Sequence, residues 1–251
     1  MNSVSRGPVL VEQGEKRIRA VVAGRVVADT VRPLLVWEVP YYPTYYFPRD
    51  DVRLEFLAET GRIAHSPSRG DAELWTIRVA QREVVDGAQE YADSPIEALR
   101  GHVRLDWQAI DAWFEEDEEV FTHPRDPRVR VDILASSRHV RVEIDGVTVA
   151  DSVHPWLLFE TNLPTRYYLP KTDVRLDLLE KSDTVTQCPY KGSAEYWSVR
   201  IGDQVHADIV WGYRTPLLES QKIAGLVAFT DERADVYVDD VLQERPKTKF
   251  A

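Results

Sequence analysis

One short stretch, Thr184–Gly192 (TVTQCPYKG), places a thiol, a phenol and an amine within four residues. Cys188 is the only cysteine of the chain. A thiol becomes a nucleophile when a neighbouring base or cation lowers its pKa, and a lysine can hold an anion or react as an amine. Cys188 and Lys191 are therefore candidate catalytic residues. The alternative is a buried, inert cysteine beside a solvated lysine.

Five further residues are candidates for lining a ligand pocket with these two, namely Arg166, Tyr168, Tyr190, Trp211 and Tyr213. The cations Arg166 and Lys191 would hold an anionic group, while the aromatic rings would hold an apolar or ring-shaped part. Pockets for small molecules commonly combine apolar walls with a few convergent polar groups. Aromatic residues of β domains also serve as core, and Tyr167 and Tyr168, as neighbours in a strand, must face opposite ways.

The sequence gives little support for a metal site or for a catalytic cysteine–histidine pair. The six histidines are scattered, and a single cysteine excludes a Cys-cluster zinc site, so no metal or cofactor is expected. His206 is predicted on a strand adjacent to Cys188, with its side chain directed away from the apolar face of that strand. A dyad of Cys188 and His206 stays open as an alternative.

The composition is typical of a folded globular protein, with 251 residues, 43% of them hydrophobic and 29% charged. The formal net charge of −11 argues against nucleic-acid binding and against docking on an anionic membrane, since both depend on clustered lysine and arginine. The first residues lack the apolar core of a signal peptide, and no stretch approaches the ~20 apolar residues of a membrane span. We therefore expect a cytoplasmic location.

The chain is an internal duplication. Residues 17–38 resemble residues 139–160, and an offset of 122 relates the two copies without a gap over residues 18–91 of the first copy. Of those 74 pairs, 25 are identical, which is far above the rate for unrelated segments. The second copy then has two extra residues after Tyr213 before the match resumes.

The boundary between the copies is predicted in residues 114–128 (FEEDEEVFTHPRDPR), which combine an acidic run with two prolines and no periodicity. We accordingly divide the chain into a first domain at 1–114, a linker at 115–128 and a second domain at 129–251. Each copy then has an ordinary size for a single domain.

Glu160 and Asp208 each match an acidic residue of the first copy. Two carboxylates at a site can act as a general acid and a general base. Structural ion pairs with Arg166 or Arg175 are the simpler explanation, because both copies keep the acids while only the second keeps the motif around Cys188.

Each copy is predicted to be mainly antiparallel β structure. In the second copy, residues 140–144 and 147–149 alternate apolar and polar types on either side of Asp145-Gly146, a dipeptide that favours the type I′ turn of a hairpin. Further strands are predicted over residues 155–160, 173–180 and 194–201, with a closing hairpin from residues 225–229 and 234–240. In the strand after Gly202-Asp203, one face is predicted to carry Val205, Ala207, Ile209, Trp211 and Tyr213.

One short helix per copy is predicted to interrupt the strands. In the first copy, Ser94-Pro95-Ile96-Glu97 has the pattern of a capping box, and Gly101 is a suitable stop. The matching segment from Pro216 to Gly225 keeps the proline and the glycine. The predicted fold is two similar, coiled antiparallel β-sheet domains, each a bent sheet or a partial barrel. Without strand–helix–strand alternation, a dinucleotide-binding fold is not expected.

Both copies resemble a bacterial and fungal family of domains of unknown function, DUF427, and the resemblance covers nearly the whole chain. Its most specific motifs here are Arg166-Tyr167-Tyr168-x-Pro170, Cys188-Pro189-Tyr190-Lys191-Gly192 and Trp211-x-Tyr213 ahead of Pro216. The resemblance implies a small, mostly β domain whose motif residues line one pocket. The family is sometimes labelled nucleotidyltransferase-like, but this chain lacks the Gly-Ser followed by paired aspartates with which such transferases hold metal and triphosphate.

The first copy departs from these motifs. Ser66 and Ser68 stand where the second copy has Cys188 and Tyr190, while Arg69 keeps the positive charge of Lys191. Arginine and tryptophan of the other two motifs are replaced by Thr44 and Gln89. Positions shared by both copies are expected to hold the fold, whereas positions confined to the second copy are expected to serve its chemistry.

These patterns predict a protein that binds a small anionic molecule in a pocket of the second domain. An enzyme that uses Cys188 or Lys191 for group transfer or hydrolysis is the alternative, and a non-enzymatic interaction module is a third. The degenerate first domain would pack against the second or complete its site. The oligomeric state stays open.

Overall fold

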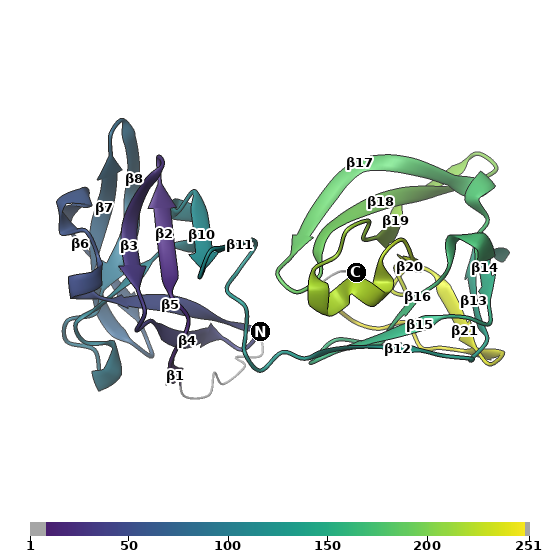
Figure 1. The fold of residues 1–251 in the computed structure, drawn as a ribbon, viewed down its shortest axis with the longest axis horizontal. Coiled ribbons are helices and arrows are strands. Elements are labelled where there is room, and N and C mark those ends of the chain that lie inside the picture. The colour runs from purple at the N-terminus through teal and green to yellow at the C-terminus, as the bar shows by residue number, and fades with distance from the viewer. Residues whose placement is uncertain (1–8, 249–251) are drawn as a thin grey trace. The chain divides into compact units, whose positions relative to one another are not determined.

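The computed structural model describes residues 9–248. These residues divide into two compact units on either side of the Asp126–Pro127 bond. Both units consist of strands joined by short helical turns (Figure 1). Within the described residues, the helical segments are all far too short to cross a bilayer.

The N-terminal unit contains two antiparallel sheets. The larger has the strand order β1 (Leu10–Gln13), β4 (Leu34–Val39), β5 (Tyr42–Pro48), β9 (His102–Leu105), β8 (Arg82–Glu90), β7 (Gly70–Val79) and β6 (Leu57–Ser66). The smaller has the order β11 (Glu118–Val120), β10 (Ala112–Glu115), β2 (Ile18–Val22) and β3 (Arg25–Thr30). The larger sheet ends in free edges at β1 and β6, so it is an open, bent sheet.

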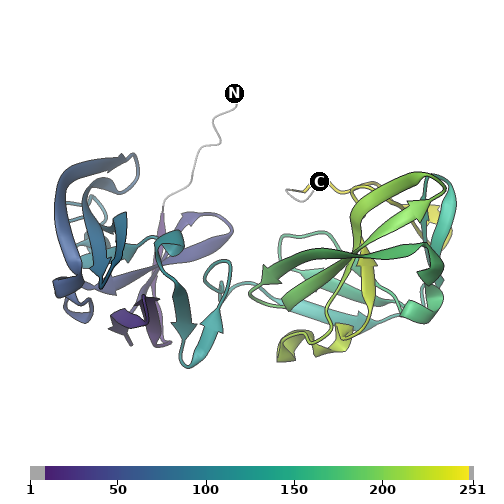
Figure 2. The same ribbon diagram turned by 90° about the horizontal axis from the view of Figure 1, so that it is seen from above.

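The C-terminal unit repeats this plan in three antiparallel sheets. The first comprises β12 (Val131–Ala135), β15 (Trp156–Glu160) and β16 (Arg166–Tyr168). The second comprises β14 (Val147–Ser152), β13 (Val140–Ile144), β21 (Asp235–Val238) and β22 (Val241–Leu242). The third comprises β17 (Leu179–Cys188), β18 (Gly192–Ile201), β19 (Gln204–Gly212) and β20 (Val227–Phe229), and its long strands β17 and β18 bend along their length (Figures 1 and 2).

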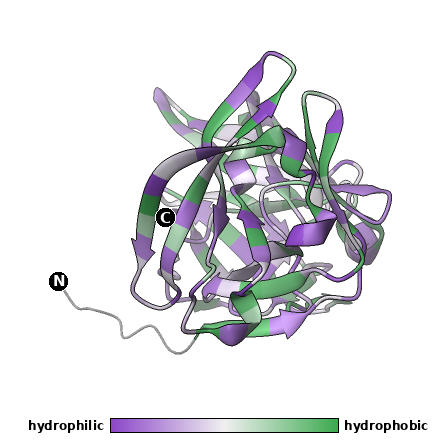
Figure 3. Ribbon diagram, turned by 90° about the vertical axis from the view of Figure 1, so that its left-hand side faces the viewer, coloured by the Kyte–Doolittle hydropathy of each residue, from purple (hydrophilic) through white to green (hydrophobic). Residues whose placement is uncertain are grey.

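Each unit encloses its own apolar core. Hydrophobic and hydrophilic residues interleave along the strands, as expected where one face of a sheet is buried (Figure 3). In the N-terminal unit the core takes side chains from both sheets, for example Ile18 of β2 and Phe47 of β5. In the C-terminal unit Val142 of β13 and Val199 of β18 belong to the matching core.

The predicted hairpin around Asp145-Gly146 is confirmed. β13 and β14 pair in antiparallel register, with Ile144 opposite Val147. Asp145 and Gly146 have φ angles of 49° and 75°, as a type I′ turn requires. The strands predicted over 155–160 and 194–201 are present as β15 and β18.

The strand predicted over residues 173–180 is wrong for most of its length. Leu176–Leu178 is a turn of 3₁₀ helix, closed by the bond from Leu178 N to Arg175 O at 3.0 Å, and the strand begins only at Leu179. Leu176 is 52% exposed, so the apolar alternation does not mark a buried face. Within the turn, the exposed side chains of Arg175 and Asp177 form an ion pair.

β19 does not keep the predicted alternation. Val205 is 46% exposed, whereas Ile209 and Val210, which are neighbours in sequence, are both buried. Asp208, just before them, has φ 53°, and the register between β19 and β18 shifts at this point. Such a bulge inserts extra residues into one strand and changes which side chains face the core. The prediction that Val205, Ala207, Ile209, Trp211 and Tyr213 share one face is therefore wrong.

The closing hairpin predicted from residues 225–229 and 234–240 is also wrong. β20 pairs with β19, with Phe229 opposite Val210, while β21 pairs with β13 and β22. The two segments thus lie in different sheets. Between them, the acidic side chains of Asp231 and Glu232 are held by Arg166.

The helices predicted after Ser94 and Pro216 are short 3₁₀ segments. Ser94 Oγ accepts a bond from Ile96 N at 3.1 Å, but the helical turn starts later, at Glu97. The segment of the second copy is six residues long, in keeping with its two extra residues. The 3₁₀ segments of the described residues are η1 (Arg49–Asp51), η2 (Leu54–Phe56), η3 (Glu97–Leu99), η4 (Trp107–Ala109), η5 (Lys171–Asp173), η6 (Leu176–Leu178) and η7 (Leu218–Ile223).

Residues 115–128, predicted as a linker, are largely part of the N-terminal unit. Strand β11 lies within this segment and pairs with β10. Glu115 is buried and accepts a 2.5 Å hydrogen bond from Tyr45 Oη. Asp126 accepts a 2.8 Å hydrogen bond from the indole of Trp37. Residues 116–119 of the acidic run are exposed, whereas Glu115 before them and Asp126 after them accept hydrogen bonds from aromatic side chains of the N-terminal unit.

Candidate functional site

The motif around Cys188 forms the turn between β17 and β18. Cys188, the last residue of β17, lies opposite Gly192, the first residue of β18. Gly192 has φ 93°, and Gly70 at the matched position of the first copy has φ 87°, a left-handed conformation that favours glycine. The glycine therefore serves the turn in both copies.

Lys191 is buried and forms an ion pair with Glu160 of β15, whose side chain is 8% exposed. Burial alone would lower the pKa of the Lys191 amine, but Cys188 and the hydrogen-bonded Glu160 raise it above its usual value. The amine is therefore held as an ammonium ion, which has no lone pair for covalent attack. Its charge is matched within the protein, by Glu160.

Arg166 is also engaged by carboxylates. Its two terminal nitrogens lie 3.0 and 2.6 Å from the oxygens of Glu232, and Nη1 lies 3.3 Å from Asp231. All three side chains are at most 12% exposed. Burial raises the pKa of Asp231 to about 7, against the opposing effect of Arg166. The bidentate pair fixes the guanidinium and leaves its charge matched by acids.

The predicted aromatic residues join this network. The Trp211 indole donates a 3.1 Å hydrogen bond to Tyr168 Oη, and the two rings meet edge to face at 87°. The Arg166 guanidinium lies over the Trp211 ring, 5.5 Å from its centroid. Burial raises the pKa of Tyr168 and that of Tyr213, so both phenols stay protonated at neutral pH.

The structure thus brings the seven predicted site residues into one region. Tyr190 is buried in the motif turn, where its carbonyl oxygen accepts a 3.1 Å hydrogen bond from Ser220 Oγ. Cys188 is half-buried and close enough to Lys191 and Tyr213 to raise their pKa values. Because these side chains contact one another or the acids Glu160, Asp231 and Glu232, the region is a largely buried polar network.

His206 does not reach Cys188. Its Nε2 lies 3.0 Å from Asp145 Oδ2 at the β13–β14 turn. In the sheet, His206 lies opposite Val199, whereas Cys188 lies opposite Gly192 at the other end of β18. At ~3.3 Å per residue, these positions are roughly 20 Å apart along the strand. The dyad of Cys188 and His206 is therefore excluded.

Glu160 and Asp208 do not pair with the predicted arginines. Glu160 pairs with Lys191, and Asp208 accepts a 2.7 Å hydrogen bond from Thr184 Oγ1. The arginines have acids closer to them, which are Glu232 and Asp231 for Arg166 and Asp177 for Arg175. The predicted ion pairs are wrong in their partners, although both carboxylates do have structural roles.

The first copy builds the same network around a carboxylate. Glu38 lies 2.5 Å from Arg69 Nη1 and 2.9 Å from Arg104 Nε, and it accepts a 2.8 Å hydrogen bond from Tyr46 Oη. The Arg69 guanidinium lies 5.2 Å from the centroid of the Tyr91 ring. The matching residues of the second copy are Glu160, Lys191, Tyr168 and Tyr213. A buried cation, carboxylate and tyrosine network is thus common to both copies.

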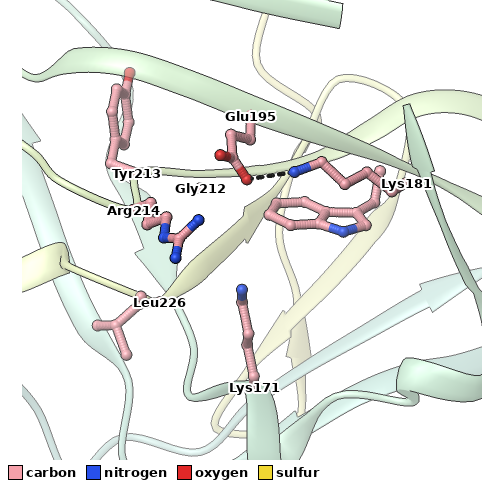
Figure 4. Close-up of a pocket in the computed structure, with 9 residues that line it drawn as sticks. Lys171, Lys181, Glu195, Gly212, Tyr213, Arg214 and Leu226 are labelled. Atoms are coloured by element: carbon pink, nitrogen blue, oxygen red, sulfur yellow. Dashed lines mark hydrogen bonds and ion pairs between the residues drawn. The ribbon is translucent and has the colours of Figure 1, made fainter. Parts of the chain in front are cut away.

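A cavity of about 280 Å³ lies in the C-terminal unit, and Tyr213 alone of the seven predicted residues lines it. The lining consists of Lys171, Lys181, Glu195, Trp197, Gly212, Tyr213, Arg214, Gly225 and Leu226. The ends of Lys171 and Arg214 point into this space, while Tyr213 directs its hydroxyl away from Arg214 (Figure 4). The cavity is therefore a second, more open arrangement of polar groups next to the buried network.

The cavity carries unmatched positive charge. Lys181 pairs with Glu195 at 2.8 Å across one wall. Lys171 Nζ lies 4.7 Å from the centroid of the Trp197 ring, and neither Lys171 nor Arg214 forms an ion pair within residues 9–248. The lining thus holds three cations, Lys171, Lys181 and Arg214, against one carboxylate, Glu195, in a chain whose net charge is −11.

The matching region of the first copy has the opposite charge. Arg49, the match of Lys171, pairs with Glu90, and Glu90 stands where the second copy has Gly212. Of the other two cations of the cavity, Lys181 is replaced by Glu59, and Arg214 follows the last matched pair, Tyr91 and Tyr213, where the second copy has two extra residues. Sequence reasoning missed Lys171 and Arg214 because they lie outside the quoted motifs. A comparison of charge, position by position, between the two copies is the signal that finds them.

A second cavity, of about 180 Å³, is lined by Tyr167, Asp231 and residues of the C-terminal segment such as Glu244. Its acidic lining suits a cation or a hydrogen-bond donor more than an anion. In the part of the chain that the structure describes, no group of three histidine, cysteine or acidic residues is arranged to hold a metal ion.

The fold and the site define a tandem pair of small antiparallel β domains, each with its own buried polar network of the same kind, and with a cationic cavity in the second domain. The chain belongs to the family described as a domain of unknown function, DUF427, whose model matches residues 10–116 and residues 132–240. A search of curated proteins finds no match to this chain.

Proposed function

We propose that the protein binds a small anionic molecule in the cavity of its C-terminal domain. The observation that supports this proposal is the convergence of Lys171 and Arg214, which form no ion pair in the described chain, in a concave site whose three cations outnumber its one carboxylate. A cationic pocket concentrates anions and speeds their association. The first copy, in which Arg49 is neutralised by Glu90, is expected not to bind.

The other lining residues give the cavity its specificity for shape. Trp197 and Leu226 supply apolar walls, and the Lys181–Glu195 pair supplies a donor and an acceptor at one side. Gly212 allows the backbone of Leu226, another lining residue, to approach closely, because a Cβ there would lie 2.5 Å from the carbonyl oxygen of Leu226. This combination of apolar walls and few polar groups is usual for small-molecule sites.

The proposed ligand is still a small anion, as the sequence predicts, but the residues that contact it are Lys171 and Arg214 in place of Lys191 and Arg166. The motif cations Lys191 and Arg166 have their charges matched by Glu160 and Glu232, so they are not assigned to the anion. A covalent role for Lys191 is disfavoured by its ionisation, and a nucleophilic role for Cys188 remains a prediction of the enzymatic alternative.

Thermal denaturation of the intact chain tests the proposal. Inorganic phosphate, sulfate and citrate serve as probes, since a ligand that binds only the native state stabilises it, by about 2.7 kcal/mol at one hundred times its Kd. We expect at least one anion to raise Tm, and the gain to disappear in Lys171→Ala and Arg214→Ala. Arg130→Ala is the matched control, because it removes an exposed cation of the same unit outside the cavity.

Two outcomes would count against this function. If no anion raised Tm, the interaction-module alternative would be favoured. If Arg214→Ala responded to anions as strongly as the unmodified chain, the binding site would lie elsewhere.

A further inference from the structure

We propose that the ligand of this cavity is a phosphomonoester dianion whose organic part carries a hydrogen-bond donor. The inference rests on the proposed function and narrows it to one chemical class. Its basis is the number, geometry and placement of the charged groups in the cavity, together with the space that they leave.

The charges favour a dianion. Lys171 and Arg214 form no ion pair in the described chain, the lining has three cations against the one carboxylate of Glu195, and both free ends point into the same space (Figure 4). A monocarboxylate or a sulfate monoester, with one negative charge, would leave one of these cations unmatched. A phosphomonoester above its second pKa of about 6 carries two charges and matches both.

The geometry favours a tetrahedral oxyanion. Arg214 offers a planar fork of N–H donors that suits two oxygens at once, while Lys171 is a point charge that approaches a third oxygen. Lys181 is already paired with Glu195 at 2.8 Å, so Lys181 is not required for the same group. Two different cations converging from different elements, η5 and the segment after β19, define a site for a compact anion.

The space left beside the phosphate group, together with Glu195, indicates the size and polarity of the organic part of the ligand. The cavity holds roughly nine water volumes, taking ~30 Å³ for each, which leaves room for more than a phosphate group. Trp197 and Leu226 would contact apolar atoms of this part. Glu195 has its pKa lowered by the hydrogen bond from Lys181, so it is an ionised acceptor for a ligand hydroxyl or amine. The same carboxylate repels a second phosphate, which disfavours di- and triphosphates.

A pH-dependent calorimetric titration of the unmodified, full-length chain tests this inference. Phenyl phosphate is the probe, and phenyl sulfate, a monoanion of the same shape, is the control. At pH 5 only about one tenth of phenyl phosphate is the dianion, given a second pKa near 6. We expect its Kd to rise about tenfold between pH 8 and pH 5, while the Kd of phenyl sulfate stays constant and weaker than that of phenyl phosphate at pH 8.

The cavity itself does not titrate in this range. Its charged and ionisable lining groups are Lys171, Lys181, Arg214, Glu195 and Tyr213, and no histidine belongs to the lining. Glu195 has a lowered pKa and Tyr213 a raised one, so both keep their state between pH 5 and pH 8. The change in affinity therefore reports the ionisation of the probe.

The outcomes separate the two proposals. If phenyl sulfate bound as tightly as phenyl phosphate, with no effect of pH on either, the dianion inference would be overturned and anion binding would stand. If neither probe bound, and inorganic phosphate, sulfate and citrate also failed to bind, both proposals would be overturned.

Discussion

At the scale of single residues, Lys191 shows how a motif cation can serve the fold instead of a ligand. Its ammonium group is buried against Glu160, and Arg69 with Glu38 repeats the arrangement in the first copy. Retention of positive charge at this position predicts an anion nearby, and that expectation is met by a carboxylate of the protein. The carboxylate lies 31 residues away in sequence, so only the fold brings it to the motif.

Removing Lys191 alone should be costly. We expect Lys191→Met to lower the free energy of unfolding by about 3–5 kcal/mol, because Glu160 would keep a buried charge without a partner. The double variant Lys191→Met/Glu160→Leu should recover most of this loss, since it removes both charges. Urea denaturation measures both values.

Lys181→Met is the matched control for this cost. Lys181 is 61% exposed and pairs with Glu195 at the surface, where ion pairs contribute less than about 1 kcal/mol. Equal losses for the two lysine variants would show that the pair of Lys191 and Glu160 is not the buried element described above.

At the scale of strands and turns, the alternation of apolar and polar residues predicts regular strands correctly. It does not predict bulges or 3₁₀ turns. The β13–β14 hairpin is predicted from Asp145-Gly146, because the positive φ angles of the turn depend only on these two adjacent residues. The bulge at Asp208 depends on how β19 pairs with β18, and the 3₁₀ turn at Leu176–Leu178 depends on local bonds that compete with the sheet. A single strand's sequence does not contain its partner's register.

Gly212 of β19 lines the cavity and lies close to the backbone of Leu226, which also lines it. A Cβ at this residue would lie 2.5 Å from the Leu226 carbonyl oxygen, so Gly212→Ala must push apart β19 and the segment that precedes β20. We expect a loss of about 1–3 kcal/mol in stability, as for other overpacked sites, together with weaker anion binding. Thermal denaturation and titration with phenyl phosphate measure the two effects.

Gly87→Ala is the control for this substitution. Its new Cβ would lie 2.9 Å from Ile77 Cδ1, at the end of a flexible side chain that can move. The Gly87 variant should therefore lose less stability than the Gly212 variant and bind phenyl phosphate normally. The opposite order would refute the role assigned to the Gly212–Leu226 contact.

At the scale of the whole molecule, the duplication explains why both units have the same fold. The two copies differ in the charge of the residues at the cavity position. The sequence correctly predicts two mainly β copies of one family domain, because the repeat and its motifs extend over nearly the entire chain. It does not predict the cavity, since Lys171 and Arg214 come from an 3₁₀ turn and a post-strand segment that only the folded sheet brings together. Placing the domain boundaries at 1–114, 115–128 and 129–251 remains a proposal, and the compact units of the structure divide at Asp126–Pro127.

The central claim is that only the second copy carries an anion site. The most direct test is a calorimetric titration of the intact chain with phenyl phosphate at pH 8, which measures the number of molecules bound per chain. We predict one molecule per chain, complete loss of binding in Lys171→Ala/Arg214→Ala, and unchanged binding in Arg49→Ala, the matching substitution in the first copy. Two molecules per chain, or binding that survives in the double variant, would contradict the claim.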